Sequence, residues 1–266
     1  MILHILQYQI DMSHPQALPG AKVLLQGLEL LRLLAQAEGP ISATALAERT
    51  GQHPSTVSRL LSGLVKAGYL RKPDYHSFSV DLGMVTMLGR VRQHFPLTTV
   101  PRAALTAHAC LLPGMRLSLA TLHEHQLVYW LTVDAGQEPV DLICGGYPLH
   151  LSSIALRILL DLPEADARAV LATSRRWYGW ELPTPHMSND EAGVLRDARS
   201  RLQDDCLILT DWQGIGHLSA AVPVRSLDGR PLILALSGPI PKQSPHDLLH
   251  AARIAVEAAL FPGDDS

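Results

Sequence analysis

Residues 51–74, GQHPSTVSRLLSGLVKAGYLRKPD, decide the fold of the first third of the chain. Large apolar side chains recur along this stretch at the 3.6-residue spacing of a helix, and small polar side chains take the opposite side. The apolar stripe contains Val57, Leu60, Leu61, Leu64 and Val65, and the low face contains Ser55, Ser58, Arg59, Ser62 and Gly63. Pro54 suits a first helical turn and Gly68 ends the pattern. We therefore expect a helix from about Pro54 to Ala67 that packs on one side only.

Two further helices are predicted upstream of this one. The segment KVLLQGLELLRLLAQAEGP, which starts at Lys22, has leucines on more than one helical face and stops at Gly39-Pro40. It predicts a helix that is buried or faces a second subunit. In ISATALAERTGQ, Ser42 is placed as an N-cap, Ile41 and Leu46 as a hydrophobic staple, and Gly51 as a left-handed helix end. With the tight turn that follows, these segments predict a helix-turn-helix.

A hairpin is predicted directly after the third helix. The segment YLRKPDYHSFSVDLG, residues 69–83, alternates apolar and polar residues on either side of the turn signal Pro73-Asp74. A helix-turn-helix followed by a hairpin is a winged helix-turn-helix. We expect this local structure for the N-terminal third of the chain.

The low face of the third helix favours DNA as its partner. A helix that enters the major groove needs short outward side chains that can form hydrogen bonds, and its N-terminus attracts phosphate. Between residues 21 and 90 there are eight basic and five acidic side chains, so this part carries +3 and the remainder −6. The alternatives are a face that simply meets solvent, or one that docks another protein. The predicted DNA contacts are Ser42, Thr44, His53, Ser55, Thr56, Ser58, Arg59 and Ser62, with Arg71, Lys72 and His76 on the hairpin.

Length and composition favour two domains and exclude a membrane protein. The chain has 266 residues, of which 47% are hydrophobic and 18% charged, and its apolar runs are shorter than a membrane span. The first residues lack a basic leader and a cleavage site, so we expect a loosely held arm at 1–20 and a cytoplasmic protein. Cys110, Cys144 and Cys206 are odd in number and far apart, so we expect buried thiols instead of disulfides or a zinc site.

The remainder of the chain predicts an α+β domain. Strand patterns occur within residues 115–136, 139–146, 206–210, 217–224 and 232–238. One or two helices are expected over 151–173 and a closing helix over 244–260, where Ser244 is the cap and Pro245 lies in the first turn. Another helix is expected to open with Ser188 and Glu191 in capping-box spacing.

Motifs of enzyme chemistry are missing from the sequence. There is no G-x-S-x-G, G-x-x-x-x-G-K-[ST] or H-E-x-x-H motif. Ser152 and Ser153 are explained by a helix N-cap, and His123, His125 and His217 by ordinary surface or core positions. We therefore predict no catalytic residue, no metal site and no cofactor. An enzyme that acts on a small metabolite, with the N-terminal domain as a tether, stays open as the alternative.

The sequence resembles the IclR-type bacterial transcriptional regulators. The resemblance rests on residues 24–74, most specifically on STVSRLLSGLVKAGYL, and continues through YPLHLSS, SAAVPVRSLDGRPL and LALSGP. It implies a winged helix-turn-helix domain at 21–82, a linker helix at 83–96 and an effector-binding domain at 97–262 with a GAF-like antiparallel sheet. It also implies a homodimer or a dimer of dimers that binds double-stranded operator DNA.

The resemblance further implies a small-molecule effector, a small organic or aromatic acid in this family. The positions that match the family's effector contacts are Ser152, Ser153, Asp211, Ser219, Ala235 and Ser237. Asp211 matches only loosely, because the family's acidic residue aligns with Leu209 or Thr210. The chain also has Ala155-Leu156 where the family usually has Gly-Lys. Whether the regulator activates or represses is left open.

Overall fold

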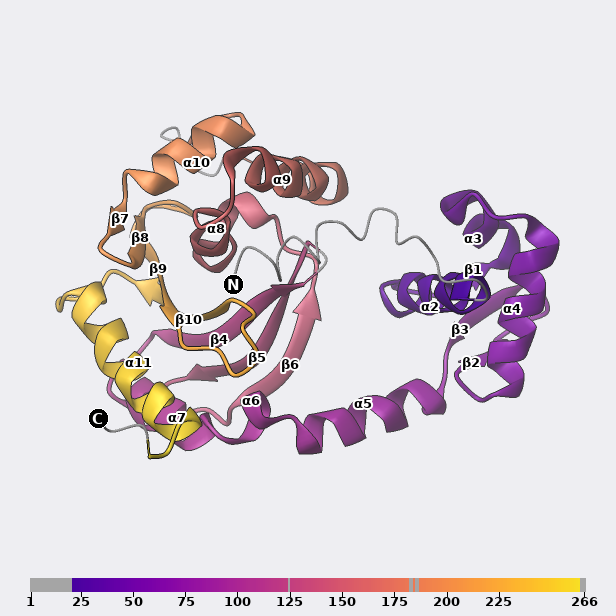
Figure 1. The fold of residues 1–266 in the computed structure, drawn as a ribbon, viewed down its shortest axis with the longest axis horizontal. Helices are drawn as coiled ribbons and strands as arrows, with labels where there is room; N and C mark the ends of the chain where they lie inside the picture. Colours follow the sequence, from indigo (N-terminus) through magenta and orange to yellow (C-terminus); the bar gives the residue numbers. More distant parts are fainter. Residues whose placement is uncertain (1–20, 124, 182–183, 185–186, 264–266) are drawn as a thin grey trace. The chain divides into compact units, whose positions relative to one another are not determined.

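The computed structural model describes residues 21–123, 125–181, 184 and 187–263. The chain divides into two compact units, which among the described residues comprise 21–94 and 95–263. We call them the head and the body (Figure 1). The arm predicted for residues 1–20 lies outside the described residues. Within the described part of the chain, no helix is long and apolar enough to cross a membrane.

The head is a winged helix-turn-helix. Its hydrophobic core is formed by α2, α3 and α4 and is closed by a three-stranded sheet in the order β1-β3-β2. Both pairings are antiparallel, with Ile41 opposite Phe78 and Leu70 opposite Val80. The elements are α2 (Ala21–Ala35), β1 (Ile41–Ser42), α3 (Ala43–Thr50), α4 (Pro54–Lys66), β2 (Leu70–Arg71), β3 (Ser77–Val80) and α5 (Leu82–His94).

The helix ends follow the capping residues that the sequence indicates. The Ser42 hydroxyl accepts a hydrogen bond of 3.2 Å from the Ala45 amide, and Gly51 closes α3 with φ of +66°. Pro54 opens α4, and Gly68 follows its end with φ of +80°. The predictions for α3 and α4 are confirmed.

The apolar stripe of α4 packs as its spacing predicts. Val57 and Leu61 are fully buried against Leu30, Leu46 and Phe78, while the other three members of the stripe are partly buried in the same core. In α2, only Leu30 and Leu34 are buried, and Val23, Leu24 and Leu28 are exposed. The first helix therefore packs one face within the chain and leaves an apolar face free of the head's core.

The body is built on one antiparallel sheet of seven strands. The strand order is β6-β5-β4-β10-β9-β8-β7, and the central pair places Leu234 opposite Leu119. The strands are β4 (Arg116–His123), β5 (Gln126–Asp134), β6 (Val140–Gly145), β7 (Leu202–Gln203), β8 (Cys206–Thr210), β9 (His217–Val224) and β10 (Leu232–Pro239). Six of these strands lie where the alternating pattern predicts them, and the two-residue β7 has no such signal.

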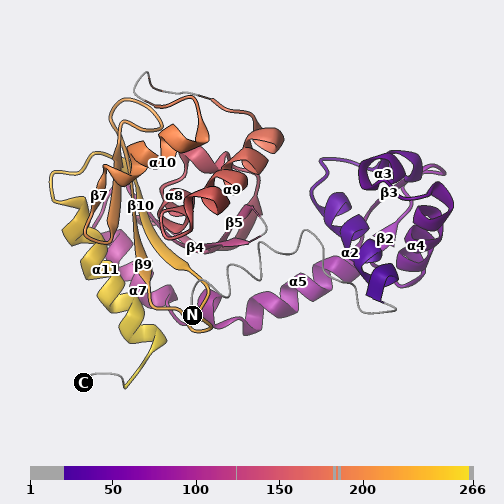
Figure 2. The ribbon, with the colours of Figure 1, turned by 45° about the horizontal axis from the view of Figure 1, so that its top comes forward.

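Helices cover both faces of this sheet (Figures 1 and 2). The short helix η2 (Leu149–Leu151), α8 (Ser153–Leu159), α9 (Glu164–Tyr178) and α10 (Glu191–Arg199) build the core on one face. On the opposite face, α7 (Arg102–Cys110) and α11 (Pro245–Leu260) build a second hydrophobic core, and α6 (Pro96–Thr99) packs beside this core. Because successive side chains of a strand point to opposite faces, the same strands contribute to both cores. Ala120 and Ala235 face α8, while Leu119 and Leu236 face α11.

Three predictions for the body need correction. The cap of α10 is Asp190 and not Ser188, because the Asp190 carboxylate accepts a 2.8 Å hydrogen bond from the Gly193 amide while Glu191 is already the first helical residue. Cys206 is a buried free thiol, but Cys110 and Cys144 are exposed. Cys110 ends α7 and Cys144 lies on the edge strand β6, where one side of the backbone has no neighbour.

Candidate functional site

The first candidate site is the low face of α4 in the head. Ser55, Ser58, Arg59 and Ser62 are all exposed, and Thr56 is half-buried. The hydroxyl of Ser62 donates a 2.8 Å hydrogen bond to the Ser58 carbonyl one turn earlier, which keeps this side chain close to the helix. The face therefore presents short side chains with a single long one, the Arg59 guanidinium. Such a surface allows close approach to the edges of base pairs.

Two of the predicted contact residues hold helix ends in place. The hydroxyl of Ser42 is engaged as the cap of α3, whereas the neighbouring Thr44 is exposed. The Nδ1 atom of His53 lies 3.4 Å from the Ser55 amide as the cap of α4, and 2.8 Å from the Ser55 hydroxyl. His53 thus orders the first turn of α4, where the helix dipole and free amides favour a phosphate.

The hairpin carries the remaining predicted contacts. Arg71, Lys72 and His76 are exposed on and between β2 and β3. The Asp74 carboxylate orders the turn by accepting hydrogen bonds from the amides of His76 and Ser77 and from the Ser77 hydroxyl. These bonds lower the pKa of Asp74, the Ser77 hydroxyl contributing most. The Lys72 ammonium lies 5.0 Å from the centre of the buried Phe78 ring, which restrains a side chain that otherwise faces solvent.

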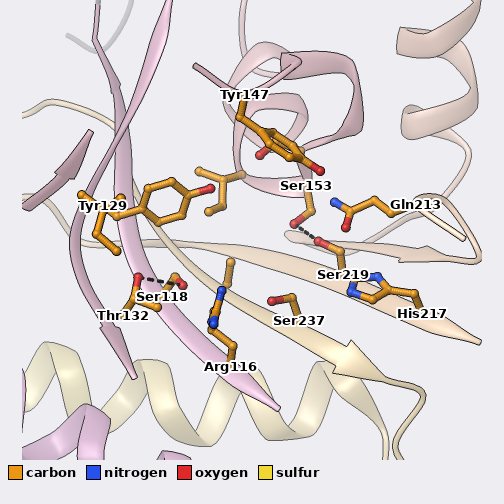
Figure 3. Close-up of a pocket in the computed structure, with 14 residues that line it drawn as sticks. Arg116, Ser118, Tyr129, Thr132, Tyr147, Ser153, Gln213, His217, Ser219 and Ser237 are labelled. Atoms are coloured by element: carbon orange, nitrogen blue, oxygen red, sulfur yellow. Dashed lines mark hydrogen bonds between the residues drawn. The ribbon is translucent and has the colours of Figure 1, made fainter. Parts of the chain in front are cut away.

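The second candidate site is a cavity of about 370 Å³ in the body. It lies between the sheet and the start of α8, and Figure 3 shows its polar side chains converging from both sides. The lining residues are Arg116, Ser118, Tyr129, Thr132, Ile143, Tyr147, Ser152, Ser153, Ile154, Gln213, His217, Ser219, Ala235 and Ser237.

A cluster of serines forms one wall of the cavity. Ser219 on β9 and Ser237 on β10 are directly opposite each other in the strand register. The Ser219 hydroxyl lies 2.5 Å from the Ser153 hydroxyl at the start of α8, and both residues are buried. Ser152 caps α8 by accepting a 3.2 Å hydrogen bond from the Ala155 amide, as the sequence predicts. The helix start is thereby aimed at the two strands.

The neighbouring strands β4 and β5 add a charged pair and hydroxyl groups, and Arg116 on β4 lies directly opposite Ser237 on β10 in the strand register. Two nitrogens of Arg116 contact the two carboxylate oxygens of Asp134 at 2.8 and 2.9 Å. This contact holds the pKa of Asp134 below its usual range, so the pair stays ionised at neutral pH. Ser118 is two residues from Arg116 on β4, and its hydroxyl lies 3.3 Å from that of Thr132 on β5.

Two tyrosines point toward the middle of the cavity (Figure 3). Burial raises the pKa of Tyr147 to about 12, with smaller contributions from Tyr129 and Glu181. Burial also raises the pKa of Tyr129, although the nearby charge of Arg116 opposes the effect. Both phenols are therefore protonated at neutral pH and can donate a hydrogen bond to a ligand.

The segment before α8 is fixed by two side chains from the loop that follows β8. The Trp212 indole donates a 2.9 Å hydrogen bond to the His150 carbonyl, and the Gln213 amide donates a 2.7 Å bond to the Leu151 carbonyl. These bonds tie the η2 turn, and hence Ser152 and Ser153, to the far side of the cavity. The cavity is therefore held in shape by the fold before any ligand binds.

The structure brings five of the six predicted effector residues to the cavity. Ser152, Ser153, Ser219, Ala235 and Ser237 line it, whereas Asp211 does not. The Asp211 carboxylate instead accepts a 2.6 Å hydrogen bond from the Gly216 amide and closes the turn between β8 and β9. Asp211 therefore has a structural task in this chain.

Sequence reasoning missed several lining residues. Ser118 and Thr132 leave a signal, because a polar residue occupies an inward position of an otherwise apolar strand in each case. No signal in the sequence marks the other lining residues, because their positions depend on how distant elements come together. These residues are Arg116, Tyr129, Tyr147 and Gln213. His217 was considered only as an isolated histidine, yet it begins β9 at the cavity wall.

Comparison with known proteins identifies the head. Residues 23–74 match the model of the IclR helix-turn-helix domain. The body and head together have the fold of solved IclR-family structures. The chain therefore carries an IclR-type helix-turn-helix domain within a fold like that of solved IclR-family structures. No sequence among curated proteins matches it.

Three solved structures illustrate the IclR-type fold. An IclR family transcriptional regulator from Brucella abortus has a TM-score of 0.71 and 21% identity, with 90% of this chain and 92% of that chain covered. A putative IclR regulator from a Silicibacter species has a TM-score of 0.66 and 20% identity, covering 88% and 94%. An IclR homologue from Microbacterium hydrocarbonoxydans, complexed with 4-hydroxybenzoate, has a TM-score of 0.61 and 17% identity, covering 90% and 99%.

Proposed function

We propose that this IclR-type regulator binds operator DNA through α4 and its hairpin and senses a small organic or aromatic acid in the body's cavity. The observation that carries the proposal is the cavity itself, which gathers hydroxyl, amide and phenol donors around a hollow of suitable size. A regulator that only bound DNA would have no need of such a hollow. We further propose that the protein acts in the cytoplasm, together with its operator.

The donors of the cavity favour an anionic ligand with an apolar body. A carboxylate would take hydrogen bonds from neutral donors such as Ser219, Ser237 and Tyr147, and Ile143 and Ile154 supply apolar contact. Because Asp134 neutralises Arg116, the cavity adds little net positive charge, so recognition would depend on these neutral donors. The homologue complexed with 4-hydroxybenzoate supports the same class of ligand.

The effector site is tested by calorimetric titration of candidate acids into the full-length protein. We expect the double variant Ser219→Ala, Ser237→Ala to bind the true effector more weakly, by about 1.5 to 3 kcal/mol for each lost bond to a charged ligand. Ser226→Ala, at a half-buried serine that does not line the cavity, is the control and should bind normally. Equal affinity in the wild type and the double variant would place the effector elsewhere.

The DNA surface is tested with operator and random duplexes. Arg59→Ala should reduce the preference for operator by about 1 to 3 kcal/mol, as expected for a lost base contact. Lys72→Ala should weaken both duplexes alike and reduce the slope of log K against log salt by about one. Equal losses of Arg59→Ala on both duplexes would reassign Arg59 to the phosphate backbone.

We also propose that the regulator works as a homodimer or a dimer of dimers. The support is the exposed apolar face of α2 and a second one on α5, where Leu82, Val85 and Leu88 are exposed and no residue is buried. Two heads are needed to read two half-sites of an operator. Sedimentation of Leu88→Glu, which should shift toward monomer, checks this assignment.

The enzyme alternative is tested on the same protein. A regulator returns its ligand unchanged, so product analysis after long incubation of the full chain with the bound acid should recover only that acid. Conversion of the acid by the wild type would favour the enzyme with a tethering head. The residues of the cavity support the sensor, because the hydroxyls of Ser153 and Ser219 are engaged with each other and that of Ser152 caps α8.

A further inference from the structure

A second cluster of polar side chains lies outside the cavity and has no role in the proposed function. Asp205 follows β7, and His246 and His250 are one turn apart at the start of α11. One ligand atom from each of the three lies within 4.8 Å of the others. The cluster belongs to the end of the sheet where α11 packs against β8 and β9 (Figure 2). We propose that it binds one divalent transition-metal ion of the zinc class.

The spacing of His250 and Asp205 suits two ligands of one metal ion. The Nε2 atom of His250 and the Oδ1 atom of Asp205 are 3.4 Å apart. Both atoms are buried, and neither has a hydrogen-bond partner among the described residues. A zinc ion about 2.0–2.2 Å from each ligand, in tetrahedral geometry, places two ligand atoms roughly 3.4 Å apart. The two atoms are therefore spaced as neighbouring ligands of one ion.

His246 is oriented to present its second nitrogen to the same ion. Its Nδ1 atom lies 3.3 Å from the Asp247 carboxylate, which favours the tautomer with the proton on Nδ1. The lone pair of Nε2 is then free and faces the β7–β8 hairpin, where the nearest carboxylate oxygen, from Asp204, is 3.9 Å away. A carboxylate behind a ligating imidazole is the arrangement that metal sites use to fix the ring.

Asp205 is held in place as an ionised ligand. Its backbone carbonyl accepts a 2.7 Å hydrogen bond from the buried Arg157 of α8, and its Oδ2 atom accepts one from Arg253 of α11. Two imidazoles and one carboxylate suit zinc, nickel, cobalt or copper better than magnesium or calcium.

Arg253 would compete with the metal for this site. Its Nη2 atom lies 3.1 Å from the Nδ1 atom of His250. A guanidinium can only donate, so Nδ1 accepts, and the ring proton is then on Nε2. Coordination through Nε2 requires the proton on Nδ1 instead. Metal binding must therefore displace Arg253 from His250, while the bond from Arg253 to Asp205 can remain.

The proposal is tested by zinc titration of tag-free, full-length protein against a chromophoric chelator. The wild type should bind one equivalent, and His246→Ala and His250→Ala should each weaken binding by at least about tenfold, since even second-shell changes have effects of that size. His94→Ala, at an exposed histidine of α5, is the control and should bind zinc as the wild type does.

The same variants also distinguish loss of the site from loss of the fold. Zinc should raise the melting temperature of the wild type and of His94→Ala but leave that of His250→Ala unchanged, because only a bound ion stabilises the native state. The chain has 13 histidines, so zinc bound equally well by the double variant His246→Ala, His250→Ala would overturn the proposal. A wild type that binds no equivalent of zinc would overturn it too.

Discussion

At the scale of single residues, His150 is the clearest case of a group whose ionisation the fold opposes. It is fully buried behind the cavity wall and stacks on Trp180 with ring centres 4.1 Å apart. Its Nε2 atom donates a 2.7 Å hydrogen bond to the Glu181 carbonyl, and Nδ1 has no partner among the described residues. Burial therefore lowers the pKa of His150, and the folded protein holds the neutral ring.

This lowered pKa predicts a loss of stability in mild acid. The unfolded chain takes up a proton on His150 near pH 6.5, before the folded chain does, so the stability present above that pH is lost as the pH falls through the window below it. One such group can change the free energy of unfolding by at most about 1.4 kcal/mol per pH unit. In denaturant titrations between pH 7.5 and 5.5, His150→Gln should show a shallower decline than the wild type. Identical declines would show that His150 titrates normally.

Gly83 supports a second prediction at this scale. Its amide donates a 2.9 Å hydrogen bond to the Gly68 carbonyl, so α5 begins against the end of α4. A Cβ atom at Gly83 would lie 2.5 Å from that carbonyl oxygen and 3.1 Å from the Tyr69 ring. Since the backbone would have to move, Gly83→Ala should lower the free energy of unfolding by about 1 to 3 kcal/mol.

Gly89, on the same helix, is the matched control for Gly83. A Cβ atom there would meet nothing within 4 Å. Gly89→Ala should therefore raise the free energy of unfolding by about 0.5 to 1 kcal/mol through helix propensity. Denaturant unfolding of the two variants gives the comparison, and a similar effect of both substitutions would mean that the contact at Gly68 does not constrain the helix.

The candidate site shows which residues a sequence can reveal. Ser219 and Ser237 can be predicted as neighbours because two alternating strands with a short turn between them fix the register. The sequence cannot predict that Arg116 and Gln213 join these serines, because they approach the cavity from a strand and a loop elsewhere in the chain. His246 and His250 share a helix face by their spacing, but Asp205 joins them only through the packing of α11 on the sheet. Local periodicity carries no information of that kind.

At the scale of elements, capping residues predict the head better than the body. Each end of α3 and α4 has a single residue that suits a helix end, so the bounds of both helices can be predicted. These residues are Ser42, Gly51, Pro54 and Gly68. Before α10, the capping-box spacing predicts Ser188, whereas the structure uses Asp190. The segment that forms α6 and α7 has no strong cap, since Phe95 and Pro101 provide no side-chain bond there, and it drew no prediction.

The recognition helix α4 carries its own prediction at Gly63. Glycine within a helix is less stable than alanine by about 1 kcal/mol, yet a Cβ atom at Gly63 would meet nothing within 4 Å in the chain. Packing inside the protein therefore does not require this glycine, which agrees with the proposed close approach of α4 to DNA. Gly63→Ala should raise the free energy of unfolding by about 0.5 to 1 kcal/mol and weaken operator binding.

The control for Gly63 is the corresponding glycine of α2, Gly27, which also has open space around its Cα. Gly27→Ala should stabilise the protein to a similar degree without changing its affinity for operator. Fluorescence anisotropy with labelled operator and denaturant unfolding provide the two measurements. Unchanged operator binding by Gly63→Ala would remove the middle of α4 from the groove.

At the scale of the whole molecule, the DNA surface and the cavity belong to different compact units and share no residue. An effector can therefore alter operator binding only by shifting an equilibrium between conformations that differ in affinity for both ligands. This requirement does not depend on whether the protein activates or represses. It leads to a quantitative expectation, because the two effects must be equal in size.

If the effector changes operator affinity by some factor, bound operator must change effector affinity by the same factor, typically about 5- to 150-fold in such systems. The first factor comes from operator titrations with and without saturating effector, and the second from calorimetric titration of effector into free protein and into its operator complex. Arg59→Ala should weaken operator binding in both effector states by one ratio and so preserve the factor, since its base contact lies in the head alone. Unequal factors would show that a further state, such as a change in subunit association, takes part in the response.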